Sequence, residues 1–178
     1  MNWYALFVET GQEETVKKLL HLHFDESTLS AFVPKRRVPE KKLGKIYHVL
    51  KKMFPGYVLI KTKMNADLFY KIKKIPKCYR ILGNRTHHSK DDEAYYSTID
   101  EEEISPILKL IGNDEVVDYS KIYVENSRVF VQSGPLKGME GIIKKVDKRK
   151  KRAKILLNFM GTEKMIDVGV EIIAKSNS

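Results

Sequence analysis

The chain has 178 residues, a formal net charge of +10 and a pI near 9.5, which favours partners rich in phosphate. This length fits two small domains, and no stretch approaches the roughly 18 uncharged apolar residues that a membrane span needs. Because Cys78 is the only cysteine, an intrachain disulfide is excluded, and we expect a cytoplasmic protein.

The first 111 residues alternate between strand and helix patterns. Aromatic and β-branched runs predict strands at residues 3–8, 32–38, 46–54, 57–62 and 78–82, and a polar loop at 83–96. Apolar residues at helical spacing predict helices at 12–24 and 65–74. A third helix is expected to follow the capping-box pattern of Thr98 and Glu101 and to end at Gly112. This alternation predicts a small α/β sandwich over residues 1–111.

The pattern changes from residue 124 onward to short strands separated by turns. Strands are predicted at residues 128–132, 141–146, 153–157, 164–168 and 170–173. Five short strands within about fifty residues indicate a small β-barrel, which we place at residues 121–178. Residues 112–120 carry no strong pattern and are expected to form an interdomain linker. The predicted fold class is therefore α+β, with two domains.

The most basic segment of the chain is 144–154, in which eight of eleven residues are Lys or Arg and only Asp147 is acidic. A turn this polar must project into solvent, and its adjacent cations repel one another unless a polyanion relieves them. We interpret it as an RNA- or DNA-binding turn, with a plain solvated face as the alternative. The candidate RNA-binding residues are Lys144, Lys145, Lys148, Arg149, Lys150, Lys151, Arg152 and Lys154.

A second basic segment precedes it in the N-terminal half, around a turn that contains Gly44. It could lie near nucleic acid, but a solvated face explains it equally well. Its basic residues are Lys35, Arg36, Arg37, Lys41, Lys42 and Lys45.

Three motifs resemble proteins of the NusG family in their order and spacing. They are Trp3-Tyr4-Ala5-Leu6, then Met53-Phe54-Pro55-Gly56-Tyr57-Val58, and finally Val131-Gln132-Ser133-Gly134-Pro135-Leu136 with Gly138 and Gly141. The resemblance implies an N-terminal NGN domain that binds the clamp helices of the largest subunit of RNA polymerase. It also implies a C-terminal, SH3-like KOW barrel that recruits further partners.

The resemblance also implies roles for individual residues. The expected polymerase-binding residues are Trp3, Phe54, Pro55, Gly56 and Tyr57, with core packing as the alternative for Trp3, Phe54 and Tyr57. Phe159 and Met160 match the segment through which NusG barrels contact a ribosomal protein or the Rho termination factor. The density of charge in the basic turn resembles the LoaP subgroup, whose members are processive antiterminators that use the KOW domain on an RNA hairpin.

These features favour a monomeric antitermination factor that binds polymerase and an RNA hairpin and promotes readthrough of terminators. The alternative is a housekeeping NusG that couples polymerase to ribosome or Rho. A third hypothesis is a small nuclease with His87 or His88 as its base. No cofactor or catalytic residue is expected. No metal is expected either, because His21 and His23 are two apart on a helix and point to different sides, so they cannot share one. Cys78 is expected to be an inert packing residue.

Overall fold

The computed structural model describes the backbone of residues 1–82, 85–88 and 95–175, and the side chains of residues 1–81 and 98–175. The chain divides into two compact units. The first unit contains residues 1–33 and 54–104, and the second contains residues 34–53 and 105–178. No helix in the described part of the chain is long and apolar enough to cross a membrane.

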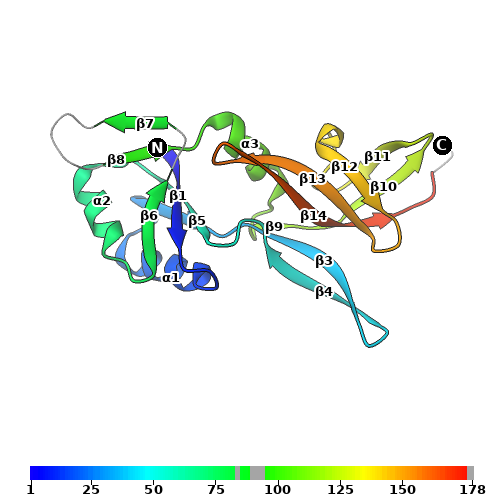
Figure 1. Cartoon of the computed structure of the whole chain (residues 1–178), viewed down its shortest axis with the longest axis horizontal. Helices are drawn as coiled ribbons and strands as arrows, with labels where there is room; N and C mark the ends of the chain where they lie inside the picture. The colour runs from blue at the N-terminus through cyan, green and yellow to red at the C-terminus, as the bar shows by residue number, and fades with distance from the viewer. Residues whose placement is uncertain (83–84, 89–94, 176–178) are drawn as a thin grey trace. The chain divides into compact units, whose positions relative to one another are not determined.

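The first unit is built on a four-stranded sheet in the order β2-β5-β1-β6 (Figure 1). Its elements are β1 (Asn2–Val8), α1 (Glu13–His23), β2 (Leu29–Phe32), β5 (Tyr57–Thr62), α2 (Ala66–Lys73) and β6 (Cys78–Leu82). Tyr4, Leu6 and Val8 share one face of β1, since side chains alternate along a strand. They join the buried core with Val16 of α1 and Ile72 of α2, so both helices cover the same face of the sheet.

Two expectations for this region were wrong. The strand predicted at 32–38 is two strands, β2 and β3 (Lys35–Lys42), and they are separated at Pro34, which has no N–H to donate to a ladder. The loop predicted at 83–96 contains β7 (Arg85–His88) and the start of its antiparallel partner β8 (Tyr95–Thr98), while residues 83–84 and 89–94 lie outside the described part.

The third helix begins later than its capping-box pattern indicates. Thr98 belongs to β8, and α3 runs from Glu101 to Leu110. The backbone N–H of Ile104 donates to the carbonyl oxygen of Asp100 at 3.0 Å, so Asp100 occupies the position expected for Thr98.

The second unit contains a five-stranded sheet in the order β11-β10-β14-β13-β12, as expected for a small barrel. The strands are β10 (Ser120–Glu125), β11 (Arg128–Ser133), β12 (Ile143–Asp147), β13 (Arg152–Phe159) and β14 (Thr162–Ile172), with a 3-10 turn at Glu140–Ile142. Five strands were predicted correctly for this sheet, but the residues that form them were predicted only in part. β10 was missed, and the two last predicted strands are the single strand β14, which runs through Gly169.

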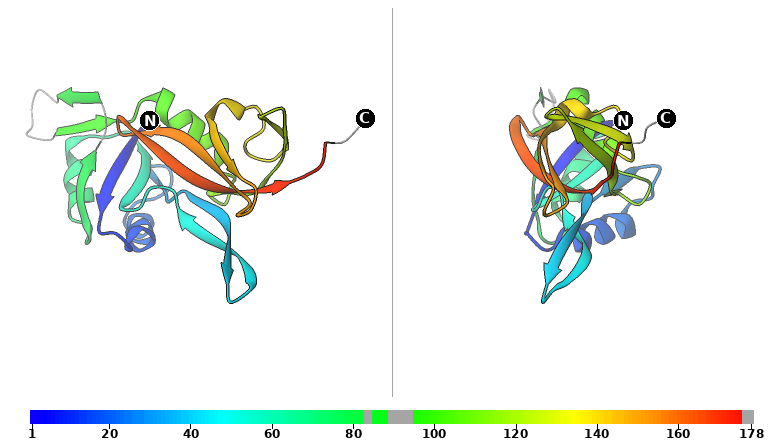
Figure 2. Two further views of the ribbon diagram at one scale, coloured as in Figure 1. Left: turned by 45° about the vertical axis from the view of Figure 1, so that its right-hand side comes forward. Right: turned by 90° about the vertical axis from the view of Figure 1, so that its right-hand side faces the viewer.

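The second unit also contains a basic hairpin from the N-terminal half of the sequence. Strands β3 and β4 (Lys45–Lys52) pair along their whole length, and Leu43 and Gly44 at the turn both have positive φ. Strand β9 (Val116–Val117) adds to β3 in parallel, so the segment expected as a linker contains a strand. Figure 2 shows the tip of the hairpin standing clear of the five-stranded sheet. The domain boundaries at 111 and 121 stay a prediction.

Candidate functional site

The basic turn between β12 and β13 is closed by its single acidic residue. Asp147 faces Arg152 across the hairpin, and its Oδ1 accepts a hydrogen bond from the backbone N–H of Lys150 at 2.9 Å. This bond holds the pKa of Asp147 below its usual value, so the carboxylate stays charged near neutral pH. The side chains from Lys148 to Lys151 are all exposed. Asp147 thus shapes the turn and leaves its cations facing solvent.

The structure divides seven of the eight candidate RNA-binding residues between two separate concave surfaces, and Lys154 lines neither. A first hollow of about 520 Å³ is lined by Lys144, Lys145 and Lys148, together with Arg128 of β11. A second concave surface of about 500 Å³, which we call the hairpin groove, is lined by residues 149–152 and by Lys41 of β3. Each surface therefore gains one cation from outside the basic turn, which sequence analysis of 144–154 missed.

Arg152 and Lys154 differ from the other candidates because each forms an ion pair with Asp167. The guanidinium of Arg152 donates to the carbonyl oxygen of Pro39 through Nη2 at 2.7 Å and Nε at 3.3 Å. Arg152 Nη1 and Lys154 Nζ each lie 3.9 Å from a carboxylate oxygen of Asp167. Arg152 therefore links β13 to β3, and a direct RNA contact by Arg152 stays a prediction.

The base of the β3–β4 hairpin is fixed to the barrel by further polar contacts. Arg36 Nη1 donates to the carbonyl oxygen of Asp167 at 2.6 Å, and burial lowers the pKa of Arg36 from its usual value. Arg37 Nε lies 3.4 Å from Asp118 Oδ1, and His48 Nδ1 lies 2.5 Å from the hydroxyl of Tyr119. Arg36 and Arg37 are thus tied to the barrel, whereas Lys41, Lys42 and Lys45 are exposed.

The segment expected to bind polymerase is a tight turn at the start of β5. Gly56 has φ +87°, a conformation that favours glycine, and the N–H of Tyr57 donates to the carbonyl oxygen of Phe54 at 3.2 Å. Phe54 is buried, Tyr57 is half-buried and Pro55 is exposed. A partner could reach Pro55 directly, but Phe54 would first have to be uncovered.

A buried carboxylate that sequence analysis missed supports this turn. Glu13 is fully buried, and its Oε1 accepts from the N–H of Gly56 at 2.8 Å. Both carboxylate oxygens also accept from the N–H of Gly11, at 3.1 and 3.0 Å. The sequence shows Glu13 only as an acid in the first turn of a helix, because its partner Gly56 lies far along the chain.

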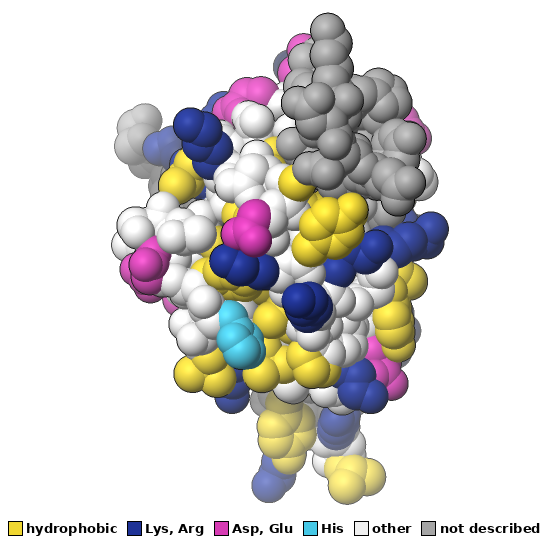
Figure 3. Space-filling model, turned by 90° about the vertical axis from the view of Figure 1, so that its left-hand side faces the viewer, with side chains coloured by type: hydrophobic (Ala, Val, Ile, Leu, Met, Phe, Trp, Pro, Cys, Tyr) yellow, Lys and Arg dark blue, Asp and Glu magenta, His cyan; other side chains and the backbone are white. Residues whose placement is uncertain are grey.

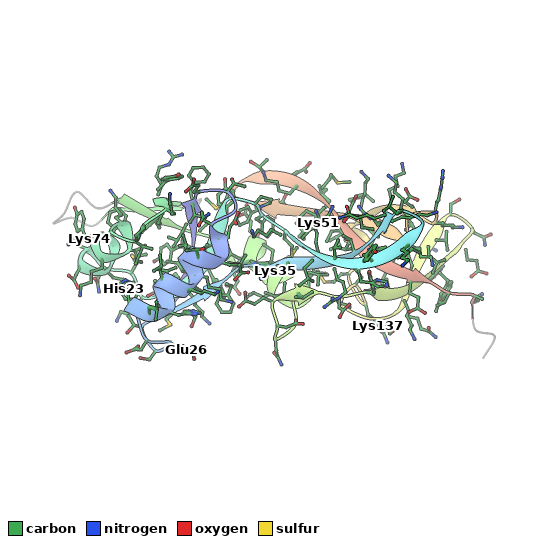
Figure 4. All side chains as sticks on the ribbon, turned by 90° about the horizontal axis from the view of Figure 1, so that it is seen from below. His23, Glu26, Lys35, Lys51, Lys74 and Lys137 are labelled. Carbon is green, nitrogen blue, oxygen red and sulfur yellow. The ribbon has the colours of Figure 1, made fainter. Side chains whose placement is uncertain are left out.

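Replacing Glu13 with alanine is expected to destabilise the first unit. The buried N–H of Gly56 loses its charged acceptor, so the free energy of unfolding should fall by about 2–4 kcal/mol, measured by urea denaturation. Glu13→Gln keeps one acceptor oxygen and should lose less. Glu26→Ala, at an exposed acidic position labelled in Figure 4, is the matched control and should unfold like the unchanged chain. Equal midpoints for Glu13→Ala and Glu26→Ala would contradict this role.

The remaining expected partner-binding residues are largely buried. Trp3 is 8 % exposed, and its ring centroid lies 5.2 Å from that of Phe32, which fits the core-packing alternative. Phe159 is fully buried at the end of β13, while Met160 has φ +56° at the tip of the β13–β14 hairpin. A partner could bind the ring of Phe159 only after it became exposed, and contact through Phe159 and Met160 stays a prediction.

In the described part of the chain, the histidines and the cysteine offer neither a metal site nor a reactive thiol. His21 Nε2 accepts from the N–H of Ala31 at 3.2 Å, and no group of three metal-binding side chains occurs among the described residues. The side chains of His87 and His88 lie outside the described residues. Burial raises the pKa of Cys78 to about 11, which disfavours the reactive thiolate at neutral pH.

On the face that Figure 3 shows, basic side chains are less clustered than on the two concave surfaces beside the β12–β13 turn. There the described Lys and Arg side chains lie apart, with hydrophobic, acidic and uncharged side chains between them. The two concave surfaces beside the β12–β13 turn instead gather cations that are close in space. Such clusters attract the phosphates of a polyanion more strongly than isolated charges do.

Comparison with known proteins agrees with this architecture. A family model described as "Transcription termination factor nusG" matches residues 1–108. The transcription termination/antitermination protein NusG of Staphylococcus epidermidis is 27 % identical, covering 98 % of this chain and 95 % of the relative, and that of Halalkalibacterium halodurans is also 27 % identical, covering 98 % of each. A solved structure of Thermotoga maritima NusG shares the fold at TM-score 0.51 and 19 % identity, covering 94 % of this chain and 93 % of that one. The chain belongs to the NusG family of transcription termination and antitermination factors.

Proposed function

We propose that this chain is a specialised NusG paralogue that binds RNA polymerase through residues 1–111 and a hairpin of the nascent RNA through the basic turn, promoting readthrough of terminators. The observation that carries the proposal is the turn itself. Asp147 is hydrogen-bonded within the turn, and the four side chains from Lys148 to Lys151 face solvent. Four adjacent cations, with Asp147 as the single acidic residue of the turn, attract the phosphates of RNA.

The polymerase contact is assigned to the turn at the start of β5 and to the clamp helices of the largest subunit. The exposed ring of Pro55 and the half-buried Tyr57 supply the accessible surface, and Phe54 joins them once it is uncovered. Holding the chain on polymerase raises the local concentration of the basic turn near the emerging transcript, so that weak RNA contacts become effective. The protein acts as a cytoplasmic monomer without cofactor or catalytic activity.

The housekeeping alternative, coupling polymerase to ribosome or Rho, uses Phe159 and Met160. Phe159 is fully buried, so this contact, like that of Phe54 with polymerase, requires the ring to be uncovered first. Binding of the full chain to either protein without measurable RNA affinity would support the alternative instead.

A terminator readthrough assay with purified polymerase tests the proposal. We expect Phe54→Ala to lose most of the readthrough given by the unchanged chain, because loss of a buried aromatic anchor costs about 2 kcal/mol or more of interface energy. Phe54→Leu keeps most of the apolar volume and is the matched control, with thermal unfolding recorded for both variants. Full readthrough by a folded Phe54→Ala protein would remove Phe54 from the polymerase contact. The loss of readthrough without loss of polymerase binding would place the defect elsewhere.

A further inference from the structure

The hairpin groove joins two basic segments that are far apart in the sequence. One wall is the end of β3 with Lys41, and Ile46, its cross-strand neighbour in β4, also lines the groove. The other wall is the β12–β13 turn from Arg149 to Arg152. The volume of about 500 Å³ lies within the range of sites that hold small ligands.

Apart from Arg152, which lies near Asp167, the cations of the groove form no ion pair within the described residues. In the described part of the chain, Lys41, Arg149, Lys150 and Lys151 form no ion pair. The acidic lining residue is Glu40, and Lys51 Nζ lies 3.4 Å from its carboxylate. The groove therefore keeps a concentrated positive charge that an anion can relieve.

The two walls are held at a fixed separation by Arg152. Its guanidinium donates twice to the carbonyl oxygen of Pro39, two residues before Lys41, and its neighbour in the chain is Lys151. One side chain thus anchors both walls at the base of the groove. Arg152 acts here as a positioning residue.

We propose that the hairpin groove binds the phosphodiester backbone of a nucleic acid, so that the β3–β4 hairpin and the β12–β13 turn form one binding surface. Lys41, Arg149, Lys150 and Lys151 contact phosphates, and the exposed side chain of Ile46 packs against sugar. The inference rests on the proposed RNA contact of the turn, and it extends that contact to a hairpin that the sequence places in the polymerase-binding half. The guanidinium of Arg149 can bridge two phosphate oxygens, whereas the lysines act as point charges.

Binding of fluorescent RNA and DNA duplexes to the full chain over a salt series tests the groove. Lys41→Ala is expected to weaken duplex binding about five- to tenfold and to reduce the salt slope by about 0.9, the loss of one phosphate contact. The matched control is Lys137→Ala, which removes one exposed charge outside the groove (Figure 4) and should change affinity less than twofold. Equal affinities of the Lys41→Ala and Lys137→Ala proteins would overturn the proposal. A preference for RNA or for DNA identifies the source of the phosphates, and either one supports it.

The positioning role of Arg152 is tested separately, by the backbone amide signals of an Arg152→Lys variant. Arg152→Lys keeps the charge but cannot donate twice to Pro39, so the backbone amide signals from Glu40 to Lys42 should shift in the free protein. Duplex affinity should fall as it does for Lys41→Ala. Unshifted amides with unchanged affinity would contradict the role.

A second probe separates failure of the groove from failure of the proposed RNA function. Inorganic tripolyphosphate is expected to shift the amide signals of Lys41, Ile46 and residues 149–151 in the unchanged full chain, and Lys41→Ala should weaken these shifts. If these shifts occur while RNA hairpins do not bind, the proposed anion binding by the groove is supported and the proposed RNA function is contradicted. If RNA binding depends on the turn but the amides of Lys41 and Ile46 stay unshifted, the groove fails alone. Polyglutamate that shifts the same amides as strongly as a duplex would overturn the assignment to nucleic acid.

Discussion

Alanine at the four exposed positions of the β12–β13 turn should remove most RNA binding by the full chain. The positions are Lys148, Arg149, Lys150 and Lys151, all of which face solvent. If each contacts one phosphate, the logarithm of affinity falls with the logarithm of salt at a slope of about −3.6, and affinity drops about 150-fold between 50 and 200 mM salt. The variant should lose both this affinity and most of this slope, as measured by fluorescence anisotropy with an RNA hairpin.

The control for this experiment removes the same charge from other exposed positions. A quadruple variant at Lys18, Lys63, Lys74 and Lys137 lowers the net charge equally. It should keep most of the affinity, since attraction between exposed charges is screened beyond about 7–14 Å at these salt concentrations. Equal losses in both quadruple variants would show that net charge, and not the turn, attracts RNA. Circular dichroism of both variants would confirm that the barrel remains folded.

Gly169→Ala should be strongly destabilising, although Gly169 lies in a strand without positive φ. A Cβ at this position would overlap the ring of Tyr119 and lie 2.7 Å from the carbonyl oxygen of Arg37. Since the backbone of β3 cannot yield as a flexible side chain would, we expect the free energy of unfolding to fall by about 3 kcal/mol. The midpoint of thermal unfolding should fall by about 6–12 °C for a chain of this size.

Two further variants test the cause of this effect. Gly141→Ala is the matched control, because a Cβ there meets nothing within 4 Å, and its unfolding midpoint should stay near that of the unchanged chain. Tyr119→Ala combined with Gly169→Ala removes the ring but leaves the Arg37 carbonyl, so it should recover part of the loss that Gly169→Ala adds. A midpoint for Gly169→Ala equal to that of Gly141→Ala would show that β3 and Tyr119 do not pack on β14 in solution.

The same close approach links stability to the hairpin groove. Tyr119 lies between β14 and the β3–β4 hairpin, with its ring against Gly169 of β14 and its hydroxyl beside His48 of β4. Loss of this packing should loosen the β3–β4 hairpin and with it the wall that carries Lys41. Gly169→Ala is therefore expected to weaken nucleic-acid binding as well, even though Gly169 contributes no charge.

Local sequence patterns determined the elements whose residues carry their own periodicity. The strand at β1, the helix α1 and the strand β5 all lie where apolar spacing and β-branched residues predict them, because these signals depend on neighbours a few residues away. Short motifs were sufficient to identify the NusG family, and the strand and helix patterns were sufficient to predict the α+β class. The basic turn was also evident, because it is one contiguous run of charge between two strands.

Only the tertiary structure decided which residues meet across long separations. Arg152 bonds to Pro39 across 113 positions and Glu13 to Gly56 across 43, so no local pattern could pair them. The strand β14 continues through Gly169, which pairs with Arg152 of β13, and the ring of Tyr119 occupies the place of its side chain. The sequence by itself therefore determined elements such as β1, α1 and β5, the family and the charge of the turn. The tertiary structure decided that this charge divides between two surfaces, since burial and hydrogen bonding depend on where distant backbone groups come to lie.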